Sequence, residues 1–134
     1  MKTLVTFSEP RYIDIEEAGV TICTMDVSLN LNKHPAWGYI DPELIMDRFG
    51  LGYLGDFEIK AKARVHPDDK YSPELGRKIA EARCKEKAFS KASRVYACCA
   101  DAIVKAYKEL TFSSRACFEC EMKEDAHLDV LLNN

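Results

Sequence analysis

Alternating apolar and polar positions mark two long strands in the first half of the chain. Between Gly19 and Leu31, the residues at odd positions from Thr21 onward are of types that can be buried, whereas the residues at even positions from Thr24 onward are polar. Between Phe57 and Val65 apolar residues alternate with charged ones in the same way. A period of two is that of a half-buried strand. With shorter apolar runs over 3–7 and 11–15, the pattern predicts an antiparallel meander that opens the fold, followed by one more strand.

The sequence contains two signals for the start of a helix. Asp41-Pro42 has the order of an N-cap followed by proline in the first turn, and it predicts a short helix over Pro42–Arg48. Ser72-Pro73-Glu74 repeats that order, and from there to about Leu110 no further proline and no asparagine interrupts a stretch rich in Ala, Lys, Arg and Glu. We expect one long helix, or two in near continuity.

Two neighbouring apolar lines run along this helix, and together they predict the stripe that packs on the sheet. One line carries the larger side chains: Leu75, Ile79, Ala82, Phe89, Ala92, Tyr96, Cys99, Ile103 and Ala106. The other carries mostly small ones: Ala80, Cys84, Ala88 and Val95. A helix this long exceeds what a small sheet can cover. We therefore expect a homodimer or higher homo-oligomer, joined partly through this helix.

The end of the chain predicts one more strand. After 111–114, apolar and polar residues alternate over Arg115–Met122, and the tail from Glu124 to Leu132 is expected to add no more than an edge helix. The predicted fold is thus α+β. It is a single domain over 1–134, with an N-terminal antiparallel β-sheet packed on one long or two consecutive C-terminal helices.

Composition excludes several classes of protein. The chain has 134 residues, 47% of them hydrophobic and 31% charged, as in ordinary globular proteins. The first residues hold no extended apolar run, so we expect neither a signal peptide nor a membrane span, and we place the protein in the cytoplasm. Of its six cysteines, Cys84, Cys98 and Cys99 lie in the predicted helix, which favours buried thiols over a disulfide framework.

The charges are segregated along the chain. Residues 1–59 carry four Lys/Arg and ten Asp/Glu (net −6), 60–94 carry eleven and five (+6), and 95–134 carry four and seven (−3). A basic block inside an acidic protein favours a local anionic ligand over bulk nucleic acid. A solvated helix face is the alternative interpretation of the same block.

No motif in the sequence indicates catalysis or a bound cofactor. Gly50–Gly55 has the spelling of a dinucleotide fingerprint, but it follows a helix signal and leads into a strand, the reverse of what that motif requires. Cys117 and Cys120 form a C-x-x-C that could bind zinc with His127, yet within the predicted strand they would point to opposite faces. We expect a protein that is not an enzyme and that needs no metal or cofactor.

The basic block instead suggests anion binding. Its strand row of Lys60, Lys62 and Arg64 ends beside a helix N-terminus, whose free N–H groups attract phosphate. Arg77 and Arg83 could add bidentate contacts. Phe89 and Tyr96, seven residues apart, lie on one helix face and could stack a base. The alternative interpretation is that both rings belong to the core.

The run from Ala63 to Arg83, with its His66-Pro67-Asp68-Asp69 turn, resembles a strand-turn-helix signature found in small phage and prophage proteins. The wider layout is similar to the Thoeris anti-defence sponges, oligomers that capture a cyclic ADP-ribose isomer and so silence a bacterial immune signal. The resemblance implies a phosphate-clasping arginine near the strand end, a stacking aromatic on the helix and a further arginine. The matching positions are Arg64, Phe89 and Arg115.

Two functional hypotheses follow. The first is a phage counter-defence protein in the host cytoplasm that sequesters a cyclic ADP-ribose-type nucleotide without degrading it, with Arg64, Arg77, Phe89, Tyr96 and Arg115 as ligand-binding residues. The alternative is an acidic phage inhibitor that binds a host defence protein such as a CRISPR nuclease. An accessory DNA-binding or virion protein fits the acidic total less well.

Overall fold

The computed structural model describes residues 4–66 and 69–133. The chain divides into two compact units, Met1–Cys99 and Ala100–Asn134. The first unit contains a sheet, a short helix and the start of a long one, whereas the second is the continuation of that long helix. The structure is thus α+β, with an N-terminal antiparallel sheet packed against a long C-terminal helix, as the sequence predicts.

The sheet is centred on its third strand. The strands are β1 (Thr6–Phe7), β2 (Arg11–Ile15), β3 (Val20–Ser28) and β4 (Asp56–Arg64). β4 pairs with β3 over its full length, and β1 and β2 both pair with β3, all antiparallel. The predicted meander is therefore wrong in its order. β1 and β2 follow one another beside β3, because β3 is long enough to pair with both.

The predicted long strand ends earlier than its apolar pattern does. Asn30 adopts a positive φ of 47°, and its side-chain amide donates to the carbonyl of Leu4 at 2.6 Å. After Asn30 the chain forms two short 3-10 turns, η2 (Leu31–Lys33) and η3 (Pro35–Tyr39). A third 3-10 turn, η1 (Glu16–Ala18), lies earlier in the chain and links β2 to β3. Leu29 and Leu31 are nevertheless fully buried. The alternating pattern therefore predicted their burial correctly, although both residues lie beyond the end of β3.

Both predicted helix starts are confirmed. In α1 (Pro42–Phe49) the carboxylate of Asp41 accepts from the backbone N–H of Glu43 at 3.2 Å. In α2 (Pro73–Leu132) the hydroxyl of Ser72 accepts from the N–H of Leu75 at 3.4 Å. None of the helices in the described residues has a stretch long and apolar enough to cross a membrane.

The strand predicted over Arg115–Met122 is wrong, because this segment belongs to α2. Its Ala, Glu and Met residues favour a helix, and neither Gly nor Pro interrupts the sequence between Gly76 and the end of the helix. A strand here would also need a neighbouring strand for its backbone groups, whereas a helix satisfies them within itself. An alternation that lasts only eight residues is too short to distinguish a strand from a helix.

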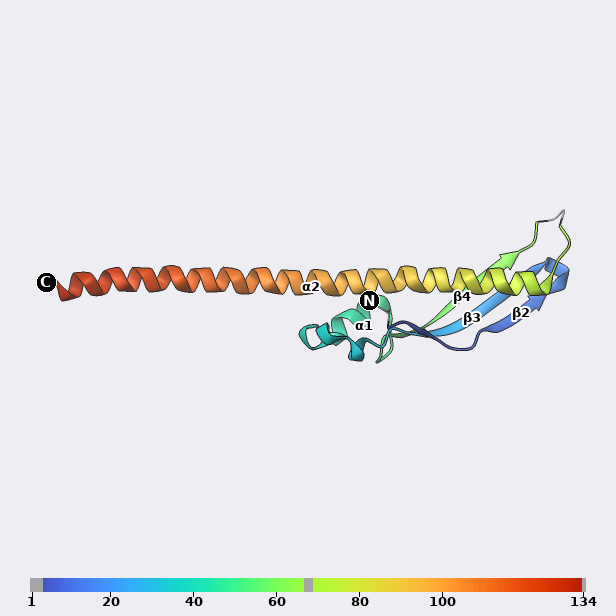
Figure 1. The fold of residues 1–134 in the computed structure, drawn as a ribbon, viewed down its shortest axis with the longest axis horizontal. Coiled ribbons are helices and arrows are strands. Elements are labelled where there is room, and N and C mark those ends of the chain that lie inside the picture. The colour runs from blue at the N-terminus through green and yellow to red at the C-terminus, as the bar shows by residue number, and fades with distance from the viewer. Residues whose placement is uncertain (1–3, 67–68, 134) are drawn as a thin grey trace. The chain divides into compact units, whose positions relative to one another are not determined.

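The first turns of α2 run alongside the sheet (Figure 1), and the residues of α2 that are buried are mostly small. The buried positions of α2 recur every three or four residues: Gly76, Ala80, Cys84, Ala88, Ala92, Val95 and Cys99. The line of larger residues stays partly outside, with Leu75 57% and Phe89 43% exposed. The expectation that both lines are covered is therefore corrected for Leu75, Ile79 and Phe89, whereas Ala92 and Cys99 of the same line are buried. Small residues allow the helix backbone to approach the sheet closely, which leaves the bulkier side chains at the margin of the contact.

The core consists of two adjoining clusters. Cys23, Met25, Ala61 and Ala63 of the sheet pack with Ala80 and Cys84 of α2. Farther along, β3 and β4 pack with α1 and the next turns of α2, around Val27, Leu29, Ile45, Phe57 and Val95. Burial raises the pKa of the Cys23 thiol, and the Cys84 thiol donates to the carbonyl of Cys23 at 3.1 Å. Cys84 and Cys99 are buried thiols as expected, whereas Cys98 is partly exposed.

Side chains of α2 also cover the outer edge of β4. The Arg83 guanidinium donates to the carbonyl of Lys62 at 2.9 Å, and the Lys87 ammonium donates to the carbonyl of Lys60 at 3.1 Å. An unpaired strand edge invites pairing with another chain. These two hydrogen bonds occupy carbonyls that an added strand would need. They also give Arg83 a structural role, where the sequence suggested a contact with an anion.

We predict that Gly76→Ala destabilises the protein. A Cβ at this position would lie 2.6 Å from Oγ1 of Thr21, a fully buried residue that is hydrogen-bonded to Asp14 and Tyr71. Overpacking of this kind costs roughly 1–3 kcal/mol, which we expect to exceed the gain of about 1 kcal/mol from replacing a helical glycine. Urea unfolding measures the difference. Gly38→Ala is the matched control, since its Cβ would meet nothing within 4 Å. Equal stability of the two variants would contradict the prediction.

Candidate anion-binding site

A cleft of about 540 Å³ lies where β4 ends and α2 begins. Its lining includes Arg64, His66, Lys70, Ser72, Leu75 and Ile79. The strand-to-helix connection thus forms a hollow at the place where the sequence predicted anion binding. Pro67 and Asp68 of the predicted turn lie outside the described residues, and the N–H of Asp69 donates to the carbonyl of His66 at 2.9 Å.

Positive charge dominates the described part of this cleft. Arg64 and Lys70 are both exposed, and neither forms an ion pair with another described residue. The first turn of α2 adds the positive end of a long helix dipole. Asp69 is an acidic residue in the lining. An anion in this hollow would lie near the cations of Arg64 and Lys70 and near the positive end of the helix dipole.

The other wall of the cleft is apolar. Leu75 and Ile79, one helical turn apart, belong to the line of larger residues that the sheet leaves uncovered. Ile79 is 37% exposed. A ligand that carries both a phosphate and a flat apolar ring could place each part against a matching wall.

Arg77, a predicted ligand-binding residue, is already engaged within the protein. Its Nε donates to Oδ2 of Asp14 at 3.0 Å, and its guanidinium lies 5.3 Å from the ring centroid of Tyr12. The Arg77 hydrogen bond, with further bonds from Thr21 and Tyr71, holds the pKa of Asp14 below its usual range despite partial burial. Arg77 therefore ties α2 to β2, and an anion would have to compete with a carboxylate for it.

The two predicted aromatic residues do not share a site with Arg64 in this unit. Phe89 packs edge-to-face on Phe7 with centroids 5.4 Å apart, and the Tyr96 hydroxyl donates to the carbonyl of Leu29 at 3.2 Å. Phe7 pairs with Val27 and Arg64 with Val20, so seven residues of β3 separate the two places. At about 3.3 Å per residue this is roughly 23 Å. Tyr96 fits the interpretation as a core residue, while Phe89 remains partly exposed.

Arg115 and the C-x-x-C pair lie in the second unit. All three side chains are exposed on α2. Cys117 and Cys120 are one helical turn apart and share a face, so the argument that a strand would separate them is wrong. Among the described residues, no three His, Cys, Asp or Glu side chains are grouped as metal ligands would be.

A second basic hollow was not predicted. It has a volume of about 320 Å³ and is lined by Ile59, Glu86, Lys87, Ser90, Lys91 and Arg94. Burial, and then the neighbouring Arg94, lower the pKa of Lys91, whose ammonium lies 4.4 Å from the ring centroid of Phe57. The spacing of Lys87, Lys91 and Arg94 puts them on one helix face and could have indicated this patch from the sequence.

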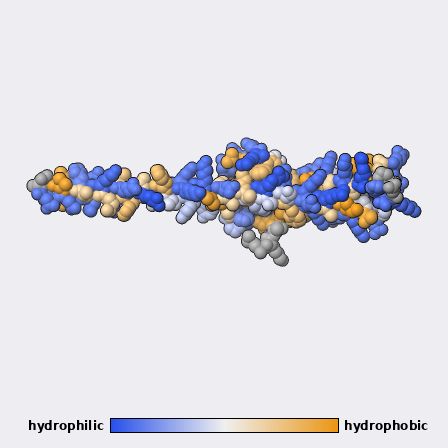
Figure 2. Space-filling view, turned by 90° about the horizontal axis from the view of Figure 1, so that it is seen from above, coloured by the Kyte–Doolittle hydropathy of each residue, from blue (hydrophilic) through white to orange (hydrophobic). Residues whose placement is uncertain are grey.

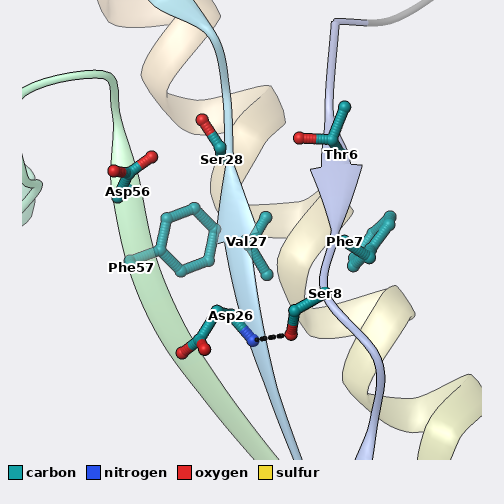
Figure 3. A pocket seen from close by; sticks show the side chains of 8 residues that line it. All are labelled: Thr6, Phe7, Ser8, Asp26, Val27, Ser28, Asp56 and Phe57. Carbon is teal, nitrogen blue, oxygen red and sulfur yellow. Dashed lines mark hydrogen bonds between the residues drawn. The ribbon is translucent and has the colours of Figure 1, made fainter.

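A third hollow, of about 560 Å³, is acidic (Figure 3). It lies across β1, β3 and β4, where the side chains of Asp26 and Asp56 flank hydroxyls such as those of Ser8 and Ser28. The Ser8 hydroxyl accepts from the backbone N–H of Asp26 at 2.9 Å. Two carboxylates disfavour phosphate here, so anion binding is better placed at the Arg64 cleft.

Comparison with protein-family models, with curated proteins and with solved structures found no match to the chain. The function of the protein is therefore inferred from the geometry of these sites and from the sequence.

The Asp14–Arg77 pair predicts a dependence of stability on pH. Because the folded protein lowers the pKa of Asp14, the pair stabilises the protein above the ordinary Asp pKa of about 4. That contribution is lost as the pH falls through this value toward the lower pKa of the folded state. We expect Asp14→Asn to be less stable than the wild type at pH 7 and the difference to shrink by pH 2.5. Urea unfolding at both pH values measures it, with exposed Glu109→Gln as the control. A deficit that is unchanged at pH 2.5 would contradict the electrostatic explanation.

Proposed function

We propose that this protein is a phage counter-defence binding protein that sequesters a cyclic ADP-ribose-type nucleotide without degrading it. The cleft between β4 and α2 would hold the phosphates of the ligand. The observation that carries the proposal is that Arg64 and the first turn of α2 line one hollow, with Lys70 at its side. The identity of the nucleotide rests on the resemblance to the Thoeris anti-defence sponges, and the anionic character of the ligand rests on the cleft.

The chemistry of the cleft suits a phosphate group. An arginine offers a planar fork of N–H donors that matches phosphate oxygens, and the N-terminus of a long helix adds a dipole that favours negative charge. Leu75 and Ile79 provide apolar contact for a base or ribose. Sequestration requires only tight binding, so the proposal assigns no chemical step to any residue.

We also propose that the binding protein works as a homo-oligomer. The resemblance implies a stacking aromatic and a second arginine at the ligand, at the positions of Phe89 and Arg115. Since Phe89 lies roughly 23 Å from Arg64 along the sheet, the stacking ring would have to come from a neighbouring subunit. Its partial exposure leaves Phe89 available for such a contact.

The alternative, an acidic inhibitor of a host defence protein, has one supporting observation. Asp26 and Asp56 flank the acidic hollow on the sheet. Several acids of this region are neutralised within the protein, however. Arg11 pairs with Asp26 at 3.0 Å and lies 3.6 Å from Glu58, and Arg77 pairs with Asp14. A surface that imitates nucleic acid needs unpaired negative charge, so we favour the nucleotide-binding function.

The proposal predicts that Arg64→Ala weakens nucleotide binding by about 10- to 100-fold, because a hydrogen bond to a charged group contributes roughly 1.5–3 kcal/mol. Calorimetric titration with a panel of cyclic ADP-ribose isomers measures the affinity. Native mass spectrometry after incubation then reports whether the ligand is retained and whether its mass is unchanged.

Arg94→Ala is the matched control, since it removes the same charge from the other basic hollow. It should leave the affinity unchanged. Absence of binding to every isomer would refute the proposed ligand. Equal loss in both variants would show that overall charge, and not the cleft, determines binding.

A further inference from the structure

The second basic hollow concentrates positive charge on one face of α2. Lys87, Lys91 and Arg94 follow one another at intervals of about one helical turn, and they line a hollow of about 320 Å³ together with Ile59 of β4. The hydroxyl group of Ser90, which also lines the hollow, can donate a hydrogen bond. All of these residues belong to the first unit, so a single chain builds the whole hollow.

Contacts with β4 hold two of the cations in place. The Lys87 ammonium donates to the carbonyl of Lys60 at 3.1 Å, and the Lys91 ammonium lies 4.4 Å from the ring centroid of Phe57. A lysine side chain that is ordered only when a ligand binds loses rotamer freedom at that moment, which weakens binding. Because β4 already restrains these two side chains, part of that loss occurs on folding and not on binding.

The cations of the hollow lack an acidic partner among the described residues. In this part of the chain none of Lys87, Lys91 and Arg94 forms an ion pair, whereas Lys85 of the same helix pairs with Glu81 at 3.3 Å. Burial, and then the neighbouring Arg94, lower the pKa of Lys91, so the charged form of this side chain is held at a cost. An anion bound beside the ammonium would offset that cost.

We propose that this hollow binds a phosphate group, either as free phosphate or as the phosphate of a small ester. Two ammonium groups and a guanidinium match the negative charge of a phosphate and offer N–H donors to several of its oxygens. The volume lies at the small end of the range for ligand pockets, which is roughly 300–1,000 Å³. The hollow therefore suits a phosphate with no more than a small substituent, in contrast to the larger ligand proposed for the Arg64 cleft.

The hollow is separate from the Arg64 cleft. Arg64 follows Ile59 by five residues along β4. At about 3.3 Å per residue this is roughly 17 Å. The hollow is therefore a second site, and its ligand does not depend on the nucleotide-binding function.

Calorimetric titration with inorganic phosphate tests the site. All chains carry Arg64→Ala, so that the other cleft does not contribute, and sodium chloride holds the ionic strength constant. We expect a dissociation constant below about 1 mM. Adding Lys91→Met or Arg94→Ala should raise it roughly tenfold or more, since each change removes a charged hydrogen-bond donor.

Ribose 5-phosphate is the second probe in the same titration. If it binds more tightly than inorganic phosphate, the ligand is an ester, and the reverse order identifies free phosphate. Absence of binding by both probes would overturn the proposal.

Lys105→Met is the matched control for the loss of a charge. Lys105 is an exposed residue of the second unit, outside the hollow. Its replacement should leave the dissociation constant for phosphate unchanged. An equal weakening in this variant would show that overall charge determines binding, and the proposed site would be wrong.

Glu86→Gln should act in the opposite direction. Glu86 is an acid that lines the hollow, and its carboxylate repels a bound phosphate. Removing this charge should lower the dissociation constant for inorganic phosphate about two- to fivefold. A constant that is unchanged or higher would contradict the placement of phosphate in the hollow.

Acetylation of Lys91 gives a local readout in the wild-type chain. A bound anion raises the pKa of the ammonium and so lowers the fraction of reactive neutral amine, and we expect inorganic phosphate to slow trace acetylation of Lys91 by about threefold or more. Peptide mass spectrometry measures the rate, with Lys105 as the internal reference. Equal slowing at Lys105, or by sodium chloride at the same ionic strength, would indicate general screening and overturn the site.

These readouts are separable from the proposed function. Phosphate binding by the Arg64→Ala chain, with no cyclic nucleotide bound by the wild type, would refute the ligand of the Arg64 cleft alone. Nucleotide binding by the wild type without phosphate binding by the Arg64→Ala chain would refute the second site alone.

Discussion

The close contact between the first turns of α2 and the sheet is the constraint on which the first unit depends. Gly76 leaves no room for a side chain against the buried Thr21, and the Cys84 thiol reaches the carbonyl of Cys23. Because the buried line of the helix is built from Gly, Ala and Cys, its backbone can lie directly on β3 and β4. Thr21 in turn bonds to Asp14 and Tyr71, so this contact also orders the connection that leads into the helix.

That contact also determines what remains outside. Since the small residues face the sheet, Leu75 and Ile79 are left at the margin, where they line one wall of the Arg64 cleft. Arg83 and Lys87 reach over the edge of β4 and bind its carbonyls, while Lys91 and Arg94 stay beside the second basic hollow. The choice of helix face therefore decides which cations of α2 bind the edge of β4 and which line the second basic hollow.

The two units differ in what they expose. The first unit presents a cleft lined by Arg64 and Lys70, whereas the second is a helix with large apolar side chains at its surface (Figure 2).

The sequence by itself determined the α+β class, the two capped helix starts and the faces of β3 and β4, because capping and period-two burial are local properties. Only the tertiary structure decided which of two adjacent apolar lines of α2 meets the sheet, since that depends on how closely the backbones can approach. It also decided that β1 and β2 share one edge of β3, and that Arg115–Met122 is helical where no strand pairs with it. The site followed the same division. The position of Arg64 beside a helix start could be predicted from the sequence. The roughly 23 Å between Arg64 and Phe89 results from strand register, and the ion pair of Arg77 with Asp14 results from the packing of α2 against β2.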